Sequence, residues 1–113
     1  MHEMSLAEGV IQVLEDHAKS QSFSRVKKIW LEVGQLANVE LESFRFCFDA
    51  VCRNSIASGS KLYIDELEGS AWCLECRKSV PYHALADPCP ICGSYQIQIT
   101  GGQELKVREL EVE

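Results

Sequence analysis

The stretch CLECRKSVPYHALADPCPIC, residues 73–92, decides how this chain folds, because it contains two Cys-x-x-Cys pairs separated by twelve residues. A Cys-x-x-Cys turn presents two thiolates to one ion, so the two turns together supply four sulfur ligands. Four thiolates in a tetrahedron suit Zn²⁺ and leave no open coordination position. Gly93 can adopt the left-handed conformation that closes the second turn. We therefore expect a structural zinc site formed by Cys73, Cys76, Cys89 and Cys92.

The residues around the two pairs predict a zinc-ribbon module over residues 69–101, with Gly69 at its start and Gly101-Gly102 where it ends. A segment of about thirty residues has too small a core to fold alone, so metal binding supplies part of its folding free energy. The CPICG turn also resembles the iron-binding turn of rubredoxin, and the ligand types alone leave a redox-active iron open. We favour zinc, because a rubredoxin-like protein has no need of the additional helices and sheet predicted below.

Outside the ribbon, hydrophobic periodicity predicts two helices and three strands. One helix is predicted over residues 5–20, with Ser5 opening a capping box, and a second begins after Asn38 as its N-cap. Alternating apolar residues predict strands at 25–34, 60–67 and 103–112. The fold class is therefore α+β, a three-stranded sheet with two helices on one face, formed by residues 1–68 and 102–113, plus the inserted ribbon. The simplest arrangement makes strands 60–67 and 103–112 antiparallel neighbours in a hairpin that carries the ribbon at its tip.

Charge and composition exclude several classes of protein. The chain has 11 basic and 17 acidic residues and a net charge of −6, which disfavours binding to nucleic acid. No stretch approaches the length of a membrane span, and no basic region precedes an apolar run at the start, so we expect neither a membrane anchor nor a signal peptide. We therefore expect a cytoplasmic protein. In that reducing compartment the cysteines are metal ligands or free thiols, and Cys47 and Cys52 are expected to be buried free thiols.

The first residues, Met1-His2-Glu3, offer ligands for a second kind of metal site. Initiator methionine is generally removed only before small residues, so the bulk of His2 predicts that Met1 and its amine remain. That amine, the backbone nitrogen and imidazole of His2, and the backbone nitrogen of Glu3 can place four nitrogens in a plane. Such coordination favours Ni(II) or Cu(II) over Zn²⁺. A chain end is more often an unimportant, frayed segment, so this chemistry alone leaves both interpretations open.

Three stretches of the chain carry a resemblance to a known family: MHEMSL, LEVGQLANVELESFRFCFDAV, and the paired Cys-x-x-Cys motifs followed by GGQELKV. The whole chain closely resembles the HypA/HybF family of hydrogenase maturation proteins. The resemblance implies a non-enzymatic nickel metallochaperone with a nickel-binding α/β domain and a zinc-ribbon domain. Carried across by position, the nickel ligand falls on His2 with Glu3 beside it, and the zinc ligands fall on the four paired cysteines. Some relatives have an aspartate, implicated near the nickel site or the GTPase contact, where this chain has Glu40, and some have a histidine where it has Gly93.

The resemblance also implies partners, namely a HypB-type GTPase and the large-subunit precursor of a [NiFe] hydrogenase. A homodimer is compatible with the sequence. The alternative function is that of a zinc-ribbon interaction adaptor without nickel transfer. The adaptor predicts one metal ion per chain, whereas the nickel carrier predicts one Zn²⁺ and one reversibly bound Ni²⁺.

Overall fold

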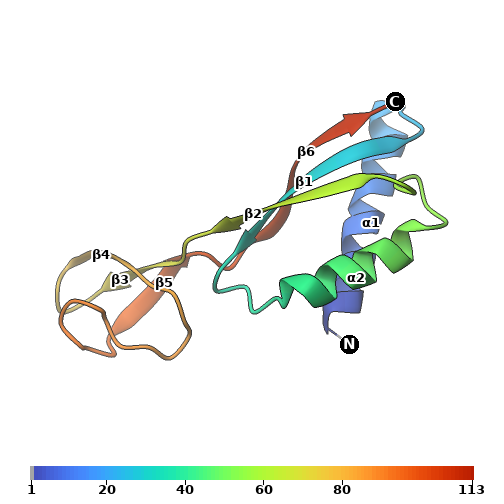
Figure 1. Ribbon diagram of the computed structural model, residues 1–113. Helices are drawn as coiled ribbons and strands as arrows, with labels where there is room; N and C mark the ends of the chain where they lie inside the picture. The colour runs from blue at the N-terminus through green and yellow to red at the C-terminus, as the bar shows by residue number, and fades with distance from the viewer. Residues whose placement is uncertain (1) are drawn as a thin grey trace. The chain divides into compact units, whose positions relative to one another are not determined.

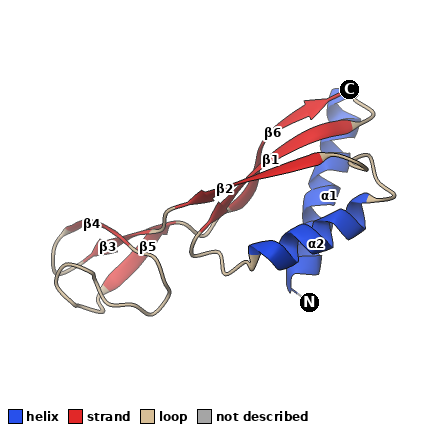
Figure 2. Ribbon diagram, viewed as in Figure 1, coloured by secondary structure: helices blue, strands red, loops and turns tan. Residues whose placement is uncertain are grey.

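The computed structural model describes residues 2–113 (Figures 1 and 2). Met1, whose amine is one of the predicted nickel ligands, lies outside the described residues. In chain order the elements are α1 (His2–Gln21), β1 (Val26–Gly34), α2 (Leu41–Cys52), β2 (Lys61–Leu67), β3 (Ser70–Cys73), β4 (Lys78–Pro81), β5 (Ile97–Gly101) and β6 (Leu105–Val112). Strands β1, β2 and β6 lie where the sequence predicts them, and both predicted helices are present, although each begins at a different residue from the predicted one. Strands β3, β4 and β5 lie within the cysteine-rich segment, where the sequence pattern predicts none.

The strands form two three-stranded sheets, in the orders β2-β1-β6 and β4-β3-β5. This confirms the α+β class, but the predicted hairpin of β2 with β6 is wrong, because β1 lies between them. The N–H of Gln35, just after β1, donates to the C=O of Leu67 at the end of β2, whereas the N–H of Glu113, just after β6, donates to the C=O of Arg25, just before β1. Strands β1 and β2 are therefore parallel, and β6 is antiparallel to β1. A parallel pair needs a crossover connection, and α2 supplies it.

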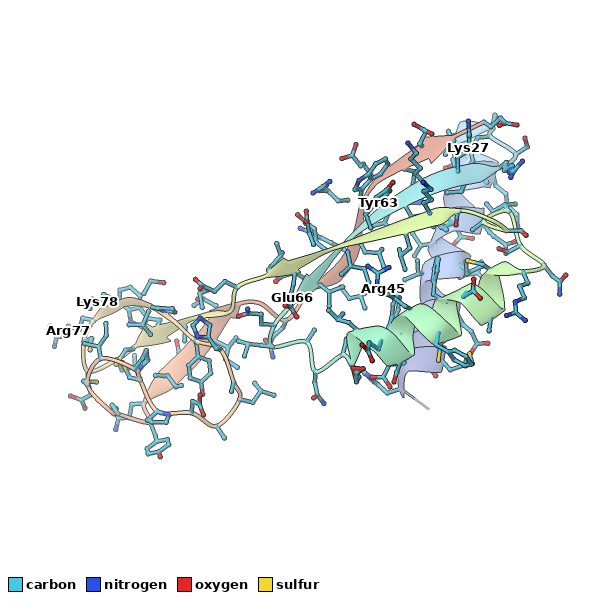
Figure 3. All side chains as sticks on the ribbon, viewed as in Figure 1. Lys27, Arg45, Tyr63, Glu66, Arg77 and Lys78 are labelled. Atoms are coloured by element: carbon cyan, nitrogen blue, oxygen red, sulfur yellow. The ribbon has the colours of Figure 1, made fainter. Side chains whose placement is uncertain are left out.

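The larger sheet buries one face under the helices. Ile29 and Leu31 of β1 are buried, as their alternation predicts, and both helices lie on the same side of the sheet (Figure 1). The buried residues of α1 recur at helical spacing and are Ala7, Val10, Ile11 and Leu14. On the opposite face, Trp30 and Tyr63 stack with ring centroids 5.2 Å apart, and Tyr63 points away from the helices (Figure 3). The helix-facing side therefore forms the core, and the other side stays partly exposed.

Both predicted helix starts are wrong. Helix α1 begins at His2, so Ser5 lies inside the helix and does not cap it. Helix α2 has Glu40 as its N-cap, and the Glu40 carboxylate accepts the N–H of Glu42 at 3.2 Å. Asn38 adopts a left-handed φ of 58°, which asparagine tolerates better than most residues. Asn38 therefore turns the chain toward α2 without capping it.

The chain divides into two compact units, which we describe separately. The first consists of the described residues up to Leu31, Val39–Ile64 and Lys106–Glu113, and it holds both helices. The second consists of Glu32–Asn38 and Asp65–Leu105, and it holds the small sheet, in which β3 pairs antiparallel with both neighbours. The hydrophobic core of this second unit is a cluster of buried residues, namely Leu36, Ala71, Cys73, Val80, Tyr82 and Cys89.

Three glycines of the second unit lie against one another's backbones where the chain enters and leaves the small sheet. A Cβ atom on Gly34 would overlap the carbonyl group of Gly102, and a Cβ on Gly102 would lie 2.5 Å from the Cα of Gly69. Gly102 also has a φ of 98°. Only glycine allows backbones to approach this closely, so these three positions are tightly packed.

Candidate metal centre

The four paired cysteines meet in the second unit, with their Sγ atoms all within 4.8 Å of one another. Cys73 ends β3, Cys76 lies in the turn to β4, and Cys89 and Cys92 lie in the loop between β4 and β5. Cys73 and Cys89 are buried, whereas Cys76 is half-buried and Cys92 is exposed. In residues 2–113, no second cluster of three or more His, Cys, Asp or Glu side chains has comparable geometry.

Hydrogen bonds shape the first turn around the sulfur of Cys73. The N–H of Cys76 donates to the Cys73 Sγ at 3.4 Å, and the N–H of Arg77 donates to the Cys73 C=O at 2.8 Å. Arg77 closes the turn with a left-handed φ of 55°. Arg77 and Lys78 lie at this turn (Figure 3), so two cations follow the first pair of ligands directly. Their charge offsets part of the net −2 charge that four thiolates and one divalent cation carry together.

The second turn repeats the pattern of the first. The N–H of Ile91 donates to the Cys89 Sγ at 3.4 Å, and the N–H of Gly93 donates to the Cys89 C=O at 2.9 Å. Gly93 has the predicted left-handed conformation, with a φ of 75°. A Cβ at Gly93 would meet no atom within 4 Å. The backbone angle, and not lack of space, therefore favours glycine at this position.

The sulfur positions fit a tetrahedral zinc ion. With Zn–S bonds of about 2.3 Å, the edge of the sulfur tetrahedron measures about 3.8 Å. The Sγ atoms of Cys73 and Cys92 are 3.6 Å apart, and those of Cys76 and Cys89 are 4.0 Å apart. Both distances far exceed the bond length of about 2.05 Å in a disulfide. The cysteines therefore form a four-ligand set for one metal ion.

The electrostatics of the cluster also call for a cation. Backbone N–H groups of the second turn lower the pKa of Cys89 to about 6, with that of Cys92 contributing most. Neighbouring sulfurs raise the pKa of Cys76 to about 12, again with Cys92 contributing most. One sulfur thus ionises readily, while another resists because hydrogen bonds with the neighbouring sulfurs, and then burial, favour its protonated form. A bound Zn²⁺ supplies the positive charge that stabilises all four thiolates and cross-links the two turns.

Tyr82 supports the second turn, a role that the sequence pattern does not reveal. Its hydroxyl donates to the C=O of Asp87 at 2.7 Å, two residues before Cys89, and the residue is buried in the core of the second unit. The N–H of Cys89 donates to the C=O of Ser94 at 2.8 Å and closes the loop from its other side. In the sequence, the one signal for this role is an aromatic residue between the two cysteine pairs.

The remaining histidines and cysteines stay outside the cluster, as the sequence analysis expects. His17 Nδ1 lies 3.0 Å from a backbone C=O of its own helix, and His83 Nε2 lies 3.1 Å from Glu68 Oε2. Cys47 and Cys52 are buried free thiols, which confirms their interpretation. Burial raises the pKa of Cys52 to about 11. These groups have local partners or apolar surroundings and are not metal ligands.

The two side chains predicted for nickel lie together in the first turn of α1. The His2 side chain is 57% exposed, whereas that of Glu3 is only 16% exposed. Nδ1 of His2 lies 3.3 Å from Oε2 of Glu3, and the same carboxylate oxygen accepts the N–H of Glu40 at 3.3 Å. The Glu40 N–H, followed by His2, holds the pKa of Glu3 below its usual value. The backbone N–H groups of His2 and Glu3 lie in the first turn of α1. No helix carbonyl accepts N–H groups at this position, so helix hydrogen bonds do not use them.

Comparison with known proteins decides the family. A family model described as "Hydrogenase/urease nickel incorporation, metallochaperone, hypA" matches residues 1–112. The chain belongs to the HypA family. It is 59% identical over 113 residues to the hydrogenase maturation factor HypA of Azotobacter chroococcum, and 57% identical to that of Azotobacter vinelandii, with both proteins covered completely in each case.

Solved structures of HypA proteins share the fold. The solution structure of the Ni metallochaperone HypA from Helicobacter pylori superimposes with a TM-score of 0.71 at 23% identity, covering 97% of this chain and 96% of that one. A second solution structure of a HypA protein gives a TM-score of 0.70 at 25% identity, covering 100% and 97%. The Helicobacter pylori comparison supports the fold alone.

Membership of the HypA family makes this chain a non-enzymatic nickel metallochaperone for [NiFe] hydrogenase maturation, with its zinc site in the four-cysteine cluster. Neither the adaptor without nickel transfer nor the iron redox protein agrees with that family. The helices within residues 2–113 lack the combination of length and apolar character that crossing a membrane requires.

Proposed function

We propose that this chain binds Ni(II) at its N-terminus and carries it through the cytoplasm for the maturation of a [NiFe] hydrogenase. The family match over residues 1–112 is the observation that carries this proposal. The family description names hydrogenase and urease together, whereas the relatives at 59% and 57% identity are both called hydrogenase maturation factors. Hydrogenase is therefore the destination that we propose.

The nickel ligands that we propose are the Met1 amine, the backbone nitrogen and imidazole of His2, and the backbone nitrogen of Glu3. The exposure of His2 at the start of α1 supports this set, because a carrier must release its ion as well as bind it. Coordination at an exposed end lets the ligands of a partner replace these ligands one at a time. Four nitrogens in a plane also select Ni(II) against the tetrahedral preference of Zn²⁺.

We further propose that a HypB-type GTPase and the large-subunit precursor of the hydrogenase are the partners in this transfer. Nickel carriage needs a donor or an acceptor that recognises the loaded form. The zinc ribbon would remain a structural element throughout, because all four coordination positions of its metal are taken by protein sulfurs.

The decisive experiment tests whether the Met1 amine is a ligand. Two residues, Gly-Ser, are added before Met1 of the full chain, which converts the amine into an amide and leaves His2 intact. We expect this extension to weaken nickel binding nearly as much as His2→Ala does, as measured by competition against a chelator. A site built only from side chains would tolerate the extension.

The zinc content of both variants serves as the control. It should equal that of the native chain, because the four cysteines belong to the second unit and the changes lie in the first. An extended chain that binds nickel as tightly as the native chain would exclude the amine as a ligand. Native nickel affinity in both variants would exclude the N-terminal site altogether.

A further inference from the structure

We propose that Tyr82 is a positioning residue whose hydroxyl keeps the cysteine cluster selective for Zn²⁺ over the Ni²⁺ that the chain carries. A nickel metallochaperone that contains four thiolates must keep its cargo out of them, because a site with sulfur ligands also binds nickel. The inference goes beyond the proposed function, and it holds whichever groups at the N-terminus bind nickel. It concerns the one hydrogen bond that joins Tyr82 to the chain just before the second pair of ligands.

The two ions differ in the arrangement of ligands that they prefer. The filled d shell of Zn²⁺ has no geometric preference, so a tetrahedron of sulfurs carries no penalty. Ni²⁺ with four strong donors prefers a square plane. In a tetrahedron, the plane through the ion and the two sulfurs of one Cys-x-x-Cys turn is perpendicular to the plane of the other turn. Bringing all four sulfurs into one plane therefore requires one turn to rotate against the other.

The second turn is held against such a rotation at both of its ends. It lies in the segment between β4 and β5, residues 82–96, in which the structure has neither helix nor strand. At the end of this segment, the N–H of Leu74 in the first turn donates to the C=O of Gln96 at 2.9 Å. Before the second turn, the Tyr82 hydroxyl donates to the C=O of Asp87 at 2.7 Å. The first of these bonds belongs to the backbone, whereas the second comes from a side chain.

Tyr82 is itself firmly placed. Its side chain is part of the core of the second unit, together with Cys73 and Cys89 from the two turns. Its N–H donates to the C=O of Gly69 at 2.9 Å, where the chain enters the small sheet. Tyr82 therefore cannot follow a movement of the second turn, and its hydroxyl stays where the tetrahedral arrangement needs it.

The chain between Asp87 and the sulfur of Cys89 is stiff enough to transmit this constraint. Pro88 and Pro90 flank Cys89, and each proline ring fixes its own φ. The N–H of Ile91 donates to the Cys89 Sγ at 3.4 Å and holds the sulfur within the turn. Rotating the turn therefore moves the Asp87 carbonyl away from the Tyr82 hydroxyl. Zinc binding keeps this hydrogen bond, whereas a planar nickel complex loses it.

The test compares the native chain with Tyr82→Phe, which removes the hydroxyl and keeps the ring in the core. The full, untagged, zinc-loaded chain is equilibrated with Ni²⁺ under reducing conditions, while a chelator fixes the free concentrations of both ions. Nickel in the cysteine cluster is recognised by its sulfur-to-nickel charge-transfer absorption, which nitrogen ligands at the N-terminus do not give. The fraction of clusters that hold nickel then yields the ratio of zinc affinity to nickel affinity.

We expect this ratio to fall about five- to tenfold in Tyr82→Phe. In the native chain a planar nickel complex breaks one hydrogen bond, and in the variant there is no bond to break, so the ratio changes by the contribution of that bond. A purely structural role would lower both affinities equally and leave the ratio unchanged. Magnetism gives a second signature, because planar Ni²⁺ with four thiolates is diamagnetic and tetrahedral Ni²⁺ is paramagnetic. NMR should show a larger diamagnetic fraction in nickel-loaded Tyr82→Phe than in the native chain.

Two further variants accompany Tyr82→Phe. Tyr95→Phe removes the hydroxyl of a tyrosine in the same segment that is 72% exposed, and it should keep the native ratio. Pro88→Gly keeps the Tyr82 hydroxyl and loosens the chain between its acceptor and Cys89. Pro88 is exposed, so this change removes little packing. We expect it to lower the ratio in the same direction as Tyr82→Phe.

Each outcome decides for or against the inference. A native ratio in folded Tyr82→Phe overturns it, as does an equal fall in Tyr95→Phe. If Tyr82→Phe fails to fold its ribbon, Pro88→Gly decides, and a native ratio there overturns the inference. Nickel bound at the N-terminus is measured separately, in the clusters that still hold zinc. Failure of the N-terminal site would therefore leave the role of Tyr82 standing, and failure of that role would leave the N-terminal site standing.

Discussion

Replacing Gly34 with alanine should destabilise the second unit far more than the same change at Gly93 does. Gly34 ends β1, and a Cβ there would overlap the backbone carbonyl of Gly102. A flexible side chain could move aside, but backbone atoms of two packed segments cannot. The added Cβ would push these two segments apart and weaken two hydrogen bonds between them. The N–H of Gly34 donates to the C=O of Glu104 at 2.8 Å, and the N–H of Leu36 donates to the C=O of Gly102 at 2.7 Å. Overpacking together with the weakening of two such bonds costs about 4 kcal/mol.

This cost is measurable because small domains are only about 5–15 kcal/mol more stable than their unfolded states. The assay is denaturant unfolding of zinc-loaded protein, followed by circular dichroism and by zinc release. Two glycines provide internal references. Gly93→Ala has open space but a φ of 75°, so it should cost about 1–2 kcal/mol. Gly9→Ala in α1 meets no atom within 4 Å and should stabilise by about 0.5–1 kcal/mol. A Gly34→Ala chain within about 1 kcal/mol of the native stability would refute the close backbone contact.

Two further predictions concern the zinc ligands and Glu3. We expect two variants to release zinc and to disorder β3, β4 and β5 while the helices persist: Cys92→Ala, which removes an exposed ligand, and Cys73→Ala, which also removes a buried core residue. Metal analysis together with circular dichroism checks this expectation. Unfolding of the whole chain in either variant would contradict it. The pKa of Glu3 lies below its ordinary value of 4.5, so its ionised carboxylate stabilises the fold above pH 4.5, and this contribution disappears as the pH falls through the lower folded value. The stability difference between the native chain and Glu3→Gln, followed by helix unfolding in urea, should therefore shrink in acid, and a difference constant from pH 7 to pH 3 would count against it.

The zinc ligands were the most predictable part of the molecule, because the relevant chemistry is local in sequence. Each Cys-x-x-Cys turn carries its own hydrogen bonds to sulfur, and Gly93 supplies the backbone angle that the second turn needs. The two turns could be assigned to one site because four thiolates complete the coordination of a single zinc ion, whereas two thiolates do not. The central strand was predictable for a similar reason, since Ile29 and Leu31 alternate with more polar neighbours and are buried.

The features that sequence analysis missed depend on residues far apart in the chain. Helix α1 begins at His2, and Glu40 is the N-cap of α2. These two helix starts contact each other through Glu3 and Glu40, which are thirty-seven residues apart in the chain. Local capping preferences favour Ser5 and Asn38 and contain no information about that contact. The strand order failed because a hairpin was assumed where a strand, a helix and a strand follow one another. That succession commonly gives a parallel pair, here β1 with β2, and β1 is central because β6 pairs with its other edge.

The zinc site and the proposed nickel site differ in how easily each can release its ion. In the second unit, sulfurs from two separate turns take all four coordination positions, so zinc leaves only when thiolates held by these folded turns let go of it. At the start of α1, the proposed nickel ligands come from adjacent residues, and the imidazole among them is 57% exposed. There the protein can give up one ligand at a time. Retention of zinc and release of nickel then follow from where each ligand set lies in the chain, and not from a difference in affinity alone.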